Sequence, residues 1–229
     1  TIHWQPEPGI CGQVRTFSGF LKTMHAPDRF HDFSTRRYMR FTPDDFIQPF
    51  LCPAELETVN GFKSLKKQIE WMAGRRLVKE MVGSTTAKRV SPCEITIAYR
   101  DEGAPFLPLY PEIQISITHS GRYAAVALCC DKDRTLGMDM EKIRPPPDTG
   151  FMKLAFTPRE RENTGEDPEK IFRNWTLKEA YLKFIKRGFN ESLHQVEIQG
   201  DVILHRGNKA KINMYYPFDN YNFYRLDNF

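Results

Sequence analysis

The sequence lacks the cysteine spacings that mark zinc or redox sites. Its five cysteines are odd in number and form no CxxC pair, so zinc fingers, redox dithiols and a secreted disulfide framework are poorly supported. We therefore expect free thiols in a reducing compartment. The cysteines are Cys11, Cys52, Cys93, Cys129 and Cys130.

Long apolar runs and a signal pattern are also absent. No apolar run reaches the roughly 18 residues that a membrane-spanning helix needs. The first residues, TIHWQPEPG, do not join a positively charged segment to an apolar one. We therefore expect a cytoplasmic protein that does not associate with membranes.

A strong excess of one charge is the third absence. The 33 basic and 29 acidic residues give a formal net charge of only +4, well below the footprint of a nucleic-acid binder. Aromatic residues make up 13% of the chain, but no strand motif combines them with basic residues for base stacking. The mild basic excess suits an anionic small ligand or an acidic protein partner.

Two long amphipathic helices are predicted from spacings of three and four between apolar residues. They occupy residues 64–82 and 168–187. Alternating or apolar segments between turn residues are typical of strands. These segments are 93–99, 112–120, 123–130, 136–143 and, as a meander of three strands, 194–226.

The two helices, each followed by short strands, also indicate an internal repeat. Aligning Trp71 with Trp175 places Lys79 over Lys183. We expect an α+β fold of two pseudo-symmetric halves, each a long helix packed on a small, mostly antiparallel sheet. The N-terminal half would comprise residues 1–131 and the C-terminal half residues 132–229.

The sharpest local signal is LGMDMEKI, at residues 136–143. Residues i and i+2 of a strand share a face, so Asp139 and Glu141 should project together. Adjacent carboxylates are costly to bury without a cation, and magnesium takes one or two carboxylates with water and substrate phosphate. The alternative is an exposed strand face that pairs with Lys142 or Arg144.

The second signal is the helical segment WTLKEAYLK. Trp175, Glu179 and Lys183 recur every four residues and form one stripe. A glutamate beside a packed helix face is available as a metal ligand or general base. An ordinary solvated Glu–Lys pair is the alternative.

Two further groups offer phosphate contacts. SITHS ends a predicted strand, where the side chains of Thr118, His119 and Ser120 supply several hydrogen-bond donors. A structural histidine is the alternative there. The first helix has a basic face, which holds phosphates or is simply solvated, and it carries Lys66, Lys67, Arg75, Arg76 and Lys79.

In this order, the segments resemble the signature series of the Sfp-type phosphopantetheinyl transferases, which serve siderophore and other secondary-metabolite carrier proteins. That series is a Gly-x-Pro turn, a Ser-His-Ser strand end, a Gly-(Ile/Val)-Asp-(Ile/Val)-Glu strand and a Trp-x-x-Lys-Glu-Ala/Ser-x-x-Lys helix. Here it reads GAP, SITHS, GMDMEKI and WTLKEAYLK, and IEWMAGRR is similar to the family's upstream helix. The resemblance spans about residues 66–190.

The chain departs from the family pattern at four positions. Thr118 stands where Ser is usual and keeps a hydroxyl, and Met138 and Met140 replace branched aliphatics, which should affect packing only. Ala104 occupies the middle of the Gly-x-Pro turn, where many relatives carry Lys. A contact to the 3′-phosphate of coenzyme A is therefore not carried over.

The resemblance implies an enzyme that transfers the 4′-phosphopantetheine arm of coenzyme A to a serine of an acyl or peptidyl carrier protein and releases 3′,5′-ADP. It implies dependence on Mg²⁺, and ligand type does not separate Mg²⁺ from Mn²⁺. It also implies a monomer whose two halves form a pseudodimer.

Residue by residue, the resemblance implies the following roles. Asp139, Glu141 and Glu179 would be metal ligands, with Glu179 alternatively the base for the carrier serine. Catalysis would involve Glu179, Lys183 and His119. Coenzyme A would be held by Arg75, Arg76, Lys79, Thr118, His119, Lys178 and Lys183.

Two other functions fit parts of these patterns. A non-catalytic coenzyme A-binding module would keep the fold, but the intact carboxylates Asp139, Glu141 and Glu179 argue against it. A metal-dependent nuclease would use Asp-x-Glu and a Lys, but it would not need the Trp-anchored helix or the Thr-His-Ser strand end.

Overall fold

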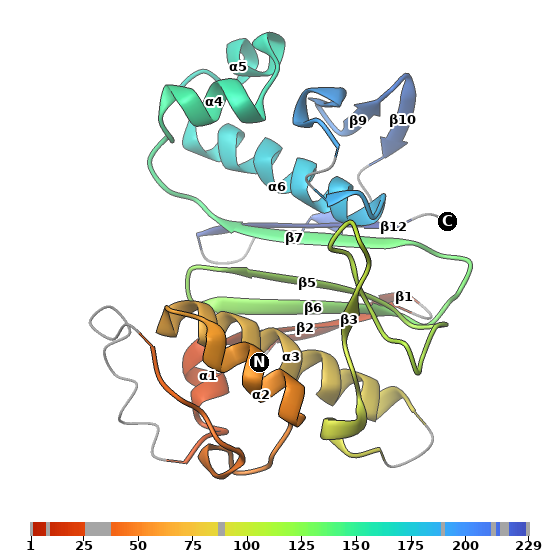
Figure 1. Cartoon of the computed structure of the whole chain (residues 1–229). Helices are drawn as coiled ribbons and strands as arrows, with labels where there is room; N and C mark the ends of the chain where they lie inside the picture. The colour runs from red at the N-terminus through yellow and green to blue at the C-terminus, as the bar shows by residue number, and fades with distance from the viewer. Residues whose placement is uncertain are drawn as a thin grey trace.

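The chain forms an α+β fold of antiparallel sheets and packed helices, as predicted. Figure 1 shows α1–α3 with strands β1, β2, β5 and β6 on one side of the molecule, and the elements from β7 onward on the other. The division into halves at residue 131 stays a prediction. The computed structural model describes residues 2–7, 10–25, 38–86, 90–188, 191–211, 214–215 and 220–227.

A four-stranded antiparallel sheet forms the base of the N-terminal side, in the order β1-β2-β6-β5. Its strands are β1 (Ile2–Glu7), β2 (Ile10–Thr16), β5 (Gln114–Ser120) and β6 (Tyr123–Cys129). The smaller elements around it are α1 (Phe17–Leu21), α2 (Pro53–Gly61), β3 (Ala98–Tyr99) and β4 (Pro105–Phe106).

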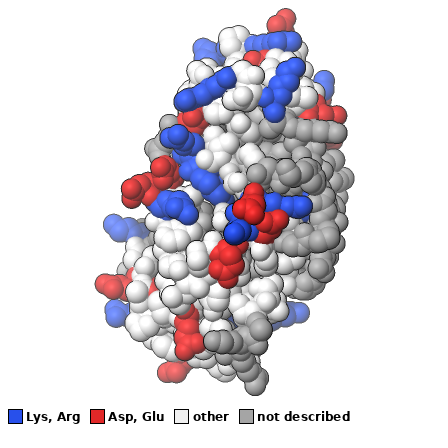
Figure 2. All heavy atoms as spheres, turned by 90° about the vertical axis from the view of Figure 1, so that its right-hand side faces the viewer, with Lys and Arg blue, Asp and Glu red and all other residues white. Residues whose placement is uncertain are grey.

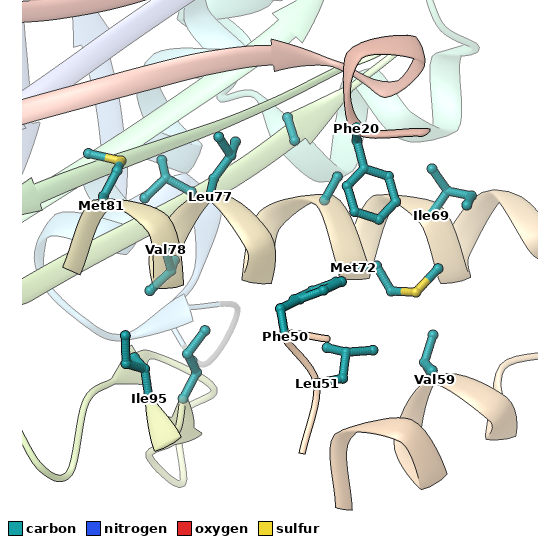
Figure 3. Packing of buried hydrophobic residues seen from close by; sticks show 14 of the residues in the cluster. Phe20, Phe50, Leu51, Val59, Ile69, Met72, Leu77, Val78, Met81 and Ile95 are labelled. Carbon is teal, nitrogen blue, oxygen red and sulfur yellow. The ribbon is translucent and has the colours of Figure 1, made fainter. Parts of the chain in front are cut away.

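The long helix α3 (Leu65–Thr85) fills the space beneath this sheet. It begins at Ser64, whose hydroxyl accepts a hydrogen bond from the N–H of Lys67. Figure 3 shows apolar side chains of α3 meeting Phe20 and Phe50 from neighbouring segments. The apolar spacing read from the sequence therefore marks a helix buried on more than one side.

A three-stranded sheet of order β11-β12-β7 forms the C-terminal side, and α6 (Pro168–Phe184) packs on it. Its strands are β7 (Leu136–Lys142), β11 (Met214–Tyr215) and β12 (Tyr221–Asp227). A separate meander and two short helices complete this side: β8 (Val196–Gln199), β9 (Val202–His205), β10 (Asn208–Lys211), α4 (Thr149–Ala155) and α5 (Pro158–Thr164).

Several predicted element boundaries are wrong. Gly200 divides the predicted strand VEIQGDVIL into β8 and β9, so this part of the tail forms two strands rather than one; residues 212–213 and 216–219 of the predicted meander lie outside the described residues. Only Ala98–Tyr99 of segment 93–99 is a strand, since Pro92 starts a short 3-10 turn. The second long helix ends at Phe184, three residues before the predicted end, and the first ends at Thr85, three residues after the predicted end.

Each side contains the same arrangement of a short helix against a long one. The short helix begins with proline, and the glutamate two residues later accepts a hydrogen bond from the backbone N–H that precedes the helix. That carboxylate also binds a buried lysine of the long helix, Glu55 to Lys79 at 2.5 Å and Glu160 to Lys178 at 2.6 Å.

This shared contact corrects the alignment made from the sequence. Lys79 of α3 corresponds to Lys178 of α6, and not to Lys183. Aligning Trp71 with Trp175 therefore gave the wrong register. The two tryptophans do not occupy equivalent positions relative to the buried ion pairs of the two helices. In the corrected register Glu80 and Glu179 are equivalent.

The state of the cysteines and the apolarity of the helices were both predicted from the sequence. All five cysteines are free thiols, as predicted. Within the ranges that the structure covers, no helix combines the length and the apolarity needed to cross a lipid bilayer.

Candidate active site

The two sides of the molecule meet where β5 lies along β7, joined by a row of hydroxyl groups on β5. Strand alternation puts Ser116, Thr118 and Ser120 on one face. Each hydroxyl accepts a hydrogen bond from a backbone N–H of β7, at 3.0 to 3.3 Å. Hydroxyl side chains therefore take the place that carbonyl groups hold in an ordinary ladder between strands.

The same hydroxyl row holds the two carboxylates of β7. The hydroxyl of Thr118 donates to Asp139 Oδ1 at 2.8 Å, and that of Ser120 donates to Glu141 Oε2 at 2.7 Å. Asp139 is 4% exposed, so its orientation depends on these contacts. Asp139 and Glu141 share one face of the strand, as their spacing predicted.

The alternate residues of β7 face the core between the sheets. Met138 and Met140 are completely buried there, against Ala125 and Ala127 of β6. Their replacement of branched aliphatics is therefore a matter of packing, as expected.

Helix α6 lies very close to β7 because Gly137 has no side chain. A Cβ atom on Gly137 would overlap the carbonyl oxygen of Ala180 and the backbone of Phe184. This approach brings Lys183 Nζ to 2.7 Å from Asp139 Oδ1, with a second hydrogen bond of 3.3 Å to the carbonyl of Ile117. The glycine of the motif thus sets the distance between the carboxylate strand and the helix.

The third carboxylate, Glu179, lies on α6 near the other two. Burial, and then the charges of Asp139 and Glu141, raise the pKa of Glu179 to about 7, although Lys183 opposes the shift. Burial and the charge of Asp139 likewise raise the pKa of Glu141. The three carboxylates therefore form one group with more negative charge than the neighbouring cation balances.

These residues provide the donor set that a hard divalent cation prefers. Asp139 Oδ2 and Glu179 Oε1 are buried without a hydrogen-bond partner, which is costly unless a cation or proton meets them. As the side chains of the described residues are oriented, no three His, Cys, Asp or Glu form a metal-binding group. The fit to magnesium thus rests on the orphaned oxygens and on the mutual repulsion of the carboxylates.

A cavity of about 450 Å³ opens beside the carboxylates, between α3, α6 and the turn before β4. Its size and mixed lining are typical of a small-molecule site. The predicted residues Arg75, His119, Glu179 and Lys183 line it, together with the Gly103–Ala104–Pro105 turn. The structure thus brings together parts of four sequence motifs that lie far apart along the chain.

Arg75 presents a flat cationic group to this cavity. Its guanidinium carbon lies 3.2 Å from the ring centroid of Trp71, and its Nη2 donates to the Tyr99 hydroxyl at 3.2 Å. Its Nε lies 3.6 Å from Glu55 Oε1. Stacking and these partners hold the guanidinium in one orientation at the cavity wall.

His119 lies between the cavity and Glu70 of α3. Its Nδ1 is 3.8 Å from Glu70 Oε2. Burial and the charges of Lys183 and Lys66 lower the pKa of His119, although Glu70 and Asp139 oppose the shift. These surroundings disfavour the protonated form of His119, whose imidazole lines the cavity as a hydrogen-bonding group.

Four residues expected to bind coenzyme A do not line the cavity. Lys79 and Lys178 are buried in the ion pairs that join the short helices to the long ones, and Arg76 binds Glu80 and the carbonyl of Gln48. Thr118 is buried, with its hydroxyl turned to Asp139. The structure corrects these assignments: the three cations stabilise the fold, and Thr118 positions a carboxylate.

Sequence reasoning missed several residues that line the cavity. Glu70, Trp71 and Tyr99 are among them, as is Lys186. Glu70 and Trp71 stand inside the segment IEWMAGRR, so the motif itself was the available signal. Lys186 lies after the last matched motif, so the motifs gave no signal for it. Its left-handed backbone and its place in the cavity wall are visible only in the structure.

Replacing Thr118 by Val is expected to destabilise the protein by about 1–3 kcal/mol, because Asp139 and the N–H of Met140 both lose a buried partner. Thr118→Ser is the matched control, since serine keeps the hydroxyl. Urea denaturation of the three proteins measures the difference. Equal stability of the Val and Ser variants would show that the hydroxyl row does not support β7.

Comparison with known proteins links this site to one family. Residues 135–216 match the family model described as the 4′-phosphopantetheinyl transferase superfamily. The matched range contains β7 and α6, and therefore all three carboxylates and Lys183.

Individual relatives match over a longer stretch. The chain is 32% identical over 153 residues to the 4′-phosphopantetheinyl transferase HetI of Nostoc sp., covering 63% of this chain and 62% of the relative. It is 24% identical over 135 residues to a 4′-phosphopantetheinyl transferase of Bacillus subtilis, covering 56% of this chain and 58% of the relative. With Sfp of Bacillus subtilis strain 168 the identity is 21% over 169 residues, covering 72% and 71%.

These relatives are matched only in part. The chain spans 58% and 62% of the length of the Bacillus transferase and of HetI. Like the matched family model, these relatives are named as 4′-phosphopantetheinyl transferases, and they are what this part of the chain resembles.

Proposed function

We propose that this chain is an Sfp-type 4′-phosphopantetheinyl transferase, which moves the phosphopantetheine arm of coenzyme A to a serine of an acyl or peptidyl carrier protein. The observation that carries the proposal is the group of Asp139, Glu141, Glu179 and Lys183 beside a cavity between α3 and α6. Residues of both sides of the chain line that cavity, in keeping with a monomer. Carriers of secondary-metabolite pathways, including siderophore synthesis, are the proposed substrates, and a cytoplasmic location stays a prediction.

The chemistry requires positioning and charge neutralisation more than covalent help. The serine oxygen forms a bond to the β-phosphorus of coenzyme A, the bond from that phosphorus to the bridging oxygen breaks, and 3′,5′-ADP leaves. Lys183 neutralises charge on the pyrophosphate, and Glu179 accepts the serine proton directly or through a water. His119 and Arg75 hold the adenosine end of the substrate.

Asp139, Glu141 and Glu179 would hold a magnesium ion, and Mn²⁺ suits the same oxygen ligands. When bound, the ion supplies positive charge to the pyrophosphate. The hydroxyls of Thr118 and Ser120 keep two of these carboxylates in place, because each donates to one of them.

Mass spectrometry of an apo-carrier protein incubated with this chain, coenzyme A and Mg²⁺ tests the proposal. We expect the carrier to gain the mass of one phosphopantetheine, and EDTA to abolish the gain. Binding of coenzyme A without any mass gain on acyl and peptidyl carriers would favour the non-catalytic module instead. Absence of coenzyme A binding would contradict both.

The free energy of unfolding of the metal-free protein is expected to fall as pH rises from about 5 to about 7.5. Burial, with Asp139 and Glu141, raises the pKa of Glu179 from 4.5 to about 7. In this window the folded protein holds a proton that the unfolded chain has released, so rising pH favours unfolding, by on the order of 3 kcal/mol in total.

Thermal unfolding in EDTA across this pH range checks that prediction. In the variant Glu179→Gln the free energy of unfolding should fall less with rising pH, because glutamine does not titrate. Parallel pH profiles of the wild type and the variant would contradict it.

A further inference from the structure

Lys186 has a backbone conformation that lysine rarely adopts. It follows the last turn of α6 with φ of 58°, in the left-handed region that favours glycine. The N–H of Lys186 donates to the carbonyl of Lys183, and the N–H of Arg187 donates to that of Leu182. These are the two hydrogen bonds of a Schellman motif, whose left-handed position is usually glycine. The chain thus keeps a lysine where glycine would be less strained.

The side chain of Lys186 lines the cavity beside the Gly103–Ala104–Pro105 turn. Its Nζ donates to the carbonyl of Leu136 at 3.1 Å. No carboxylate of the described residues forms an ion pair with it, and burial and the charge of Arg100 lower the pKa of Lys186 to about 8. An ammonium group kept partly out of water without a counterion is a candidate for binding an anion.

Lys186 and Lys183 serve different places along β7. Lys183 binds Asp139, whereas Lys186 binds the carbonyl of Leu136, three residues earlier. Three residues of a strand span roughly 10 Å, so the two ammonium groups do not meet the same phosphate. Coenzyme A carries a pyrophosphate and, separately, a phosphate on the ribose 3′-oxygen.

The neighbourhood of Lys186 is mainly basic. Figure 2 shows the side of the molecule on which α6 ends, where Lys and Arg side chains lie among Asp and Glu side chains. Lys186 also lines an adjoining groove with one acidic lining residue, Glu102, among those that the structure describes. The basic residues of this groove are Arg100, Lys132, Arg134, Lys186 and Arg187.

The other Lys and Arg residues that line the cavity, Lys67, Arg75 and Lys183, each have a contact within the protein, and Lys67 Nζ lies 5.5 Å from the ring centroid of Phe62. The guanidinium of Arg75 stacks on Trp71 and bonds to Tyr99. Lys183 is bound to Asp139. The turn itself carries Ala104 and supplies no cation.

We propose that Lys186 binds the 3′-phosphate of coenzyme A and makes the site distinguish coenzyme A from dephospho-coenzyme A. The inference rests on the proposed function and assigns a specificity-determining residue to it. Lys186 follows the end of α6 and lines the same cavity as the turn that contains Ala104, and its left-handed backbone sets the direction of its side chain.

Calorimetric titration of both ligands, with Mg²⁺ present, tests this assignment on the wild type and two variants. In Lys186→Met the affinity for coenzyme A should fall about 10- to 100-fold, and the affinity for dephospho-coenzyme A should not change. Lys186→Gly should show the same loss with a higher Tm, because glycine accepts the left-handed conformation without strain. Arg187→Gln is the matched control and should keep the preference for coenzyme A, since Arg187 is exposed and does not line the cavity.

The results separate this inference from the proposed function. A wild type that does not bind coenzyme A contradicts both. A wild type that transfers phosphopantetheine but binds the two ligands equally contradicts only the inference, and so do Lys186 variants that keep the preference for coenzyme A. A lower Tm of Lys186→Gly would show that the lysine serves the fold, and would overturn the functional reading of its strain.

Discussion

Replacing Glu179 by Gln is expected to lower the rate of phosphopantetheine transfer by about 10²- to 10⁴-fold. Glutamine has nearly the same shape but neither accepts the serine proton nor offers a charged ligand to a divalent cation. Burial and two neighbouring carboxylates raise the pKa of Glu179 to about 7, so its charge is unfavourable in the folded, metal-free protein. The variant should therefore be at least as stable as the wild type while it loses activity.

Single-turnover transfer, followed by mass spectrometry of the carrier protein, measures this loss. Glu80→Gln is the matched control because Glu80 follows the buried Lys79 as Glu179 follows Lys178, yet it binds Arg15 and Arg76 away from the cavity. Its rate should stay near that of the wild type. A Glu179→Gln enzyme with wild-type rate would remove this carboxylate from the proposed mechanism.

Replacing Lys178 by Met is expected to destabilise the protein by about 3–5 kcal/mol, because the charge of Glu160 would remain buried without its partner. Lys178 Nζ donates to Glu160 Oε2 at 2.6 Å and to the carbonyls of Ala155 and Leu193 at 2.8 and 3.0 Å. Both side chains of the pair are completely buried. Without the lysine, the carboxylate and two carbonyl groups remain in the interior without this partner.

Urea denaturation of Lys178→Met and of Lys178→Met/Glu160→Gln checks the origin of the loss. Thr157 and Ile198 donate their N–H groups to different oxygens of Glu160, so glutamine can accept from only one of them. Because glutamine removes the unpaired charge, the double variant should still recover part of the stability. A single variant that loses less than about 1 kcal/mol would contradict the account of the pair. No recovery in the double variant would show that packing, and not the unpaired charge, causes the loss.

Local periodicity predicted which side chains of the candidate site share a face. Alternation along a strand put Asp139 and Glu141 on one face, and the helical repeat put Glu179 and Lys183 on one stripe; the structure has both arrangements. Cations were predicted less well. Arg76, Lys79 and Lys178 stand in the right helices, but their partners come from segments far away in the sequence.

By itself, the sequence determined the α+β class, the two long helices, the strand that carries two carboxylates and the free state of the thiols. These features follow from residue spacing and composition, which act over a few neighbouring positions. Only the tertiary structure decided which lysines are buried in ion pairs, that hydroxyls of β5 hold the carboxylates of β7, and that Lys186 turns into the cavity. Those outcomes depend on contacts between distant segments and on one left-handed residue, and the periodicity of a sequence contains neither.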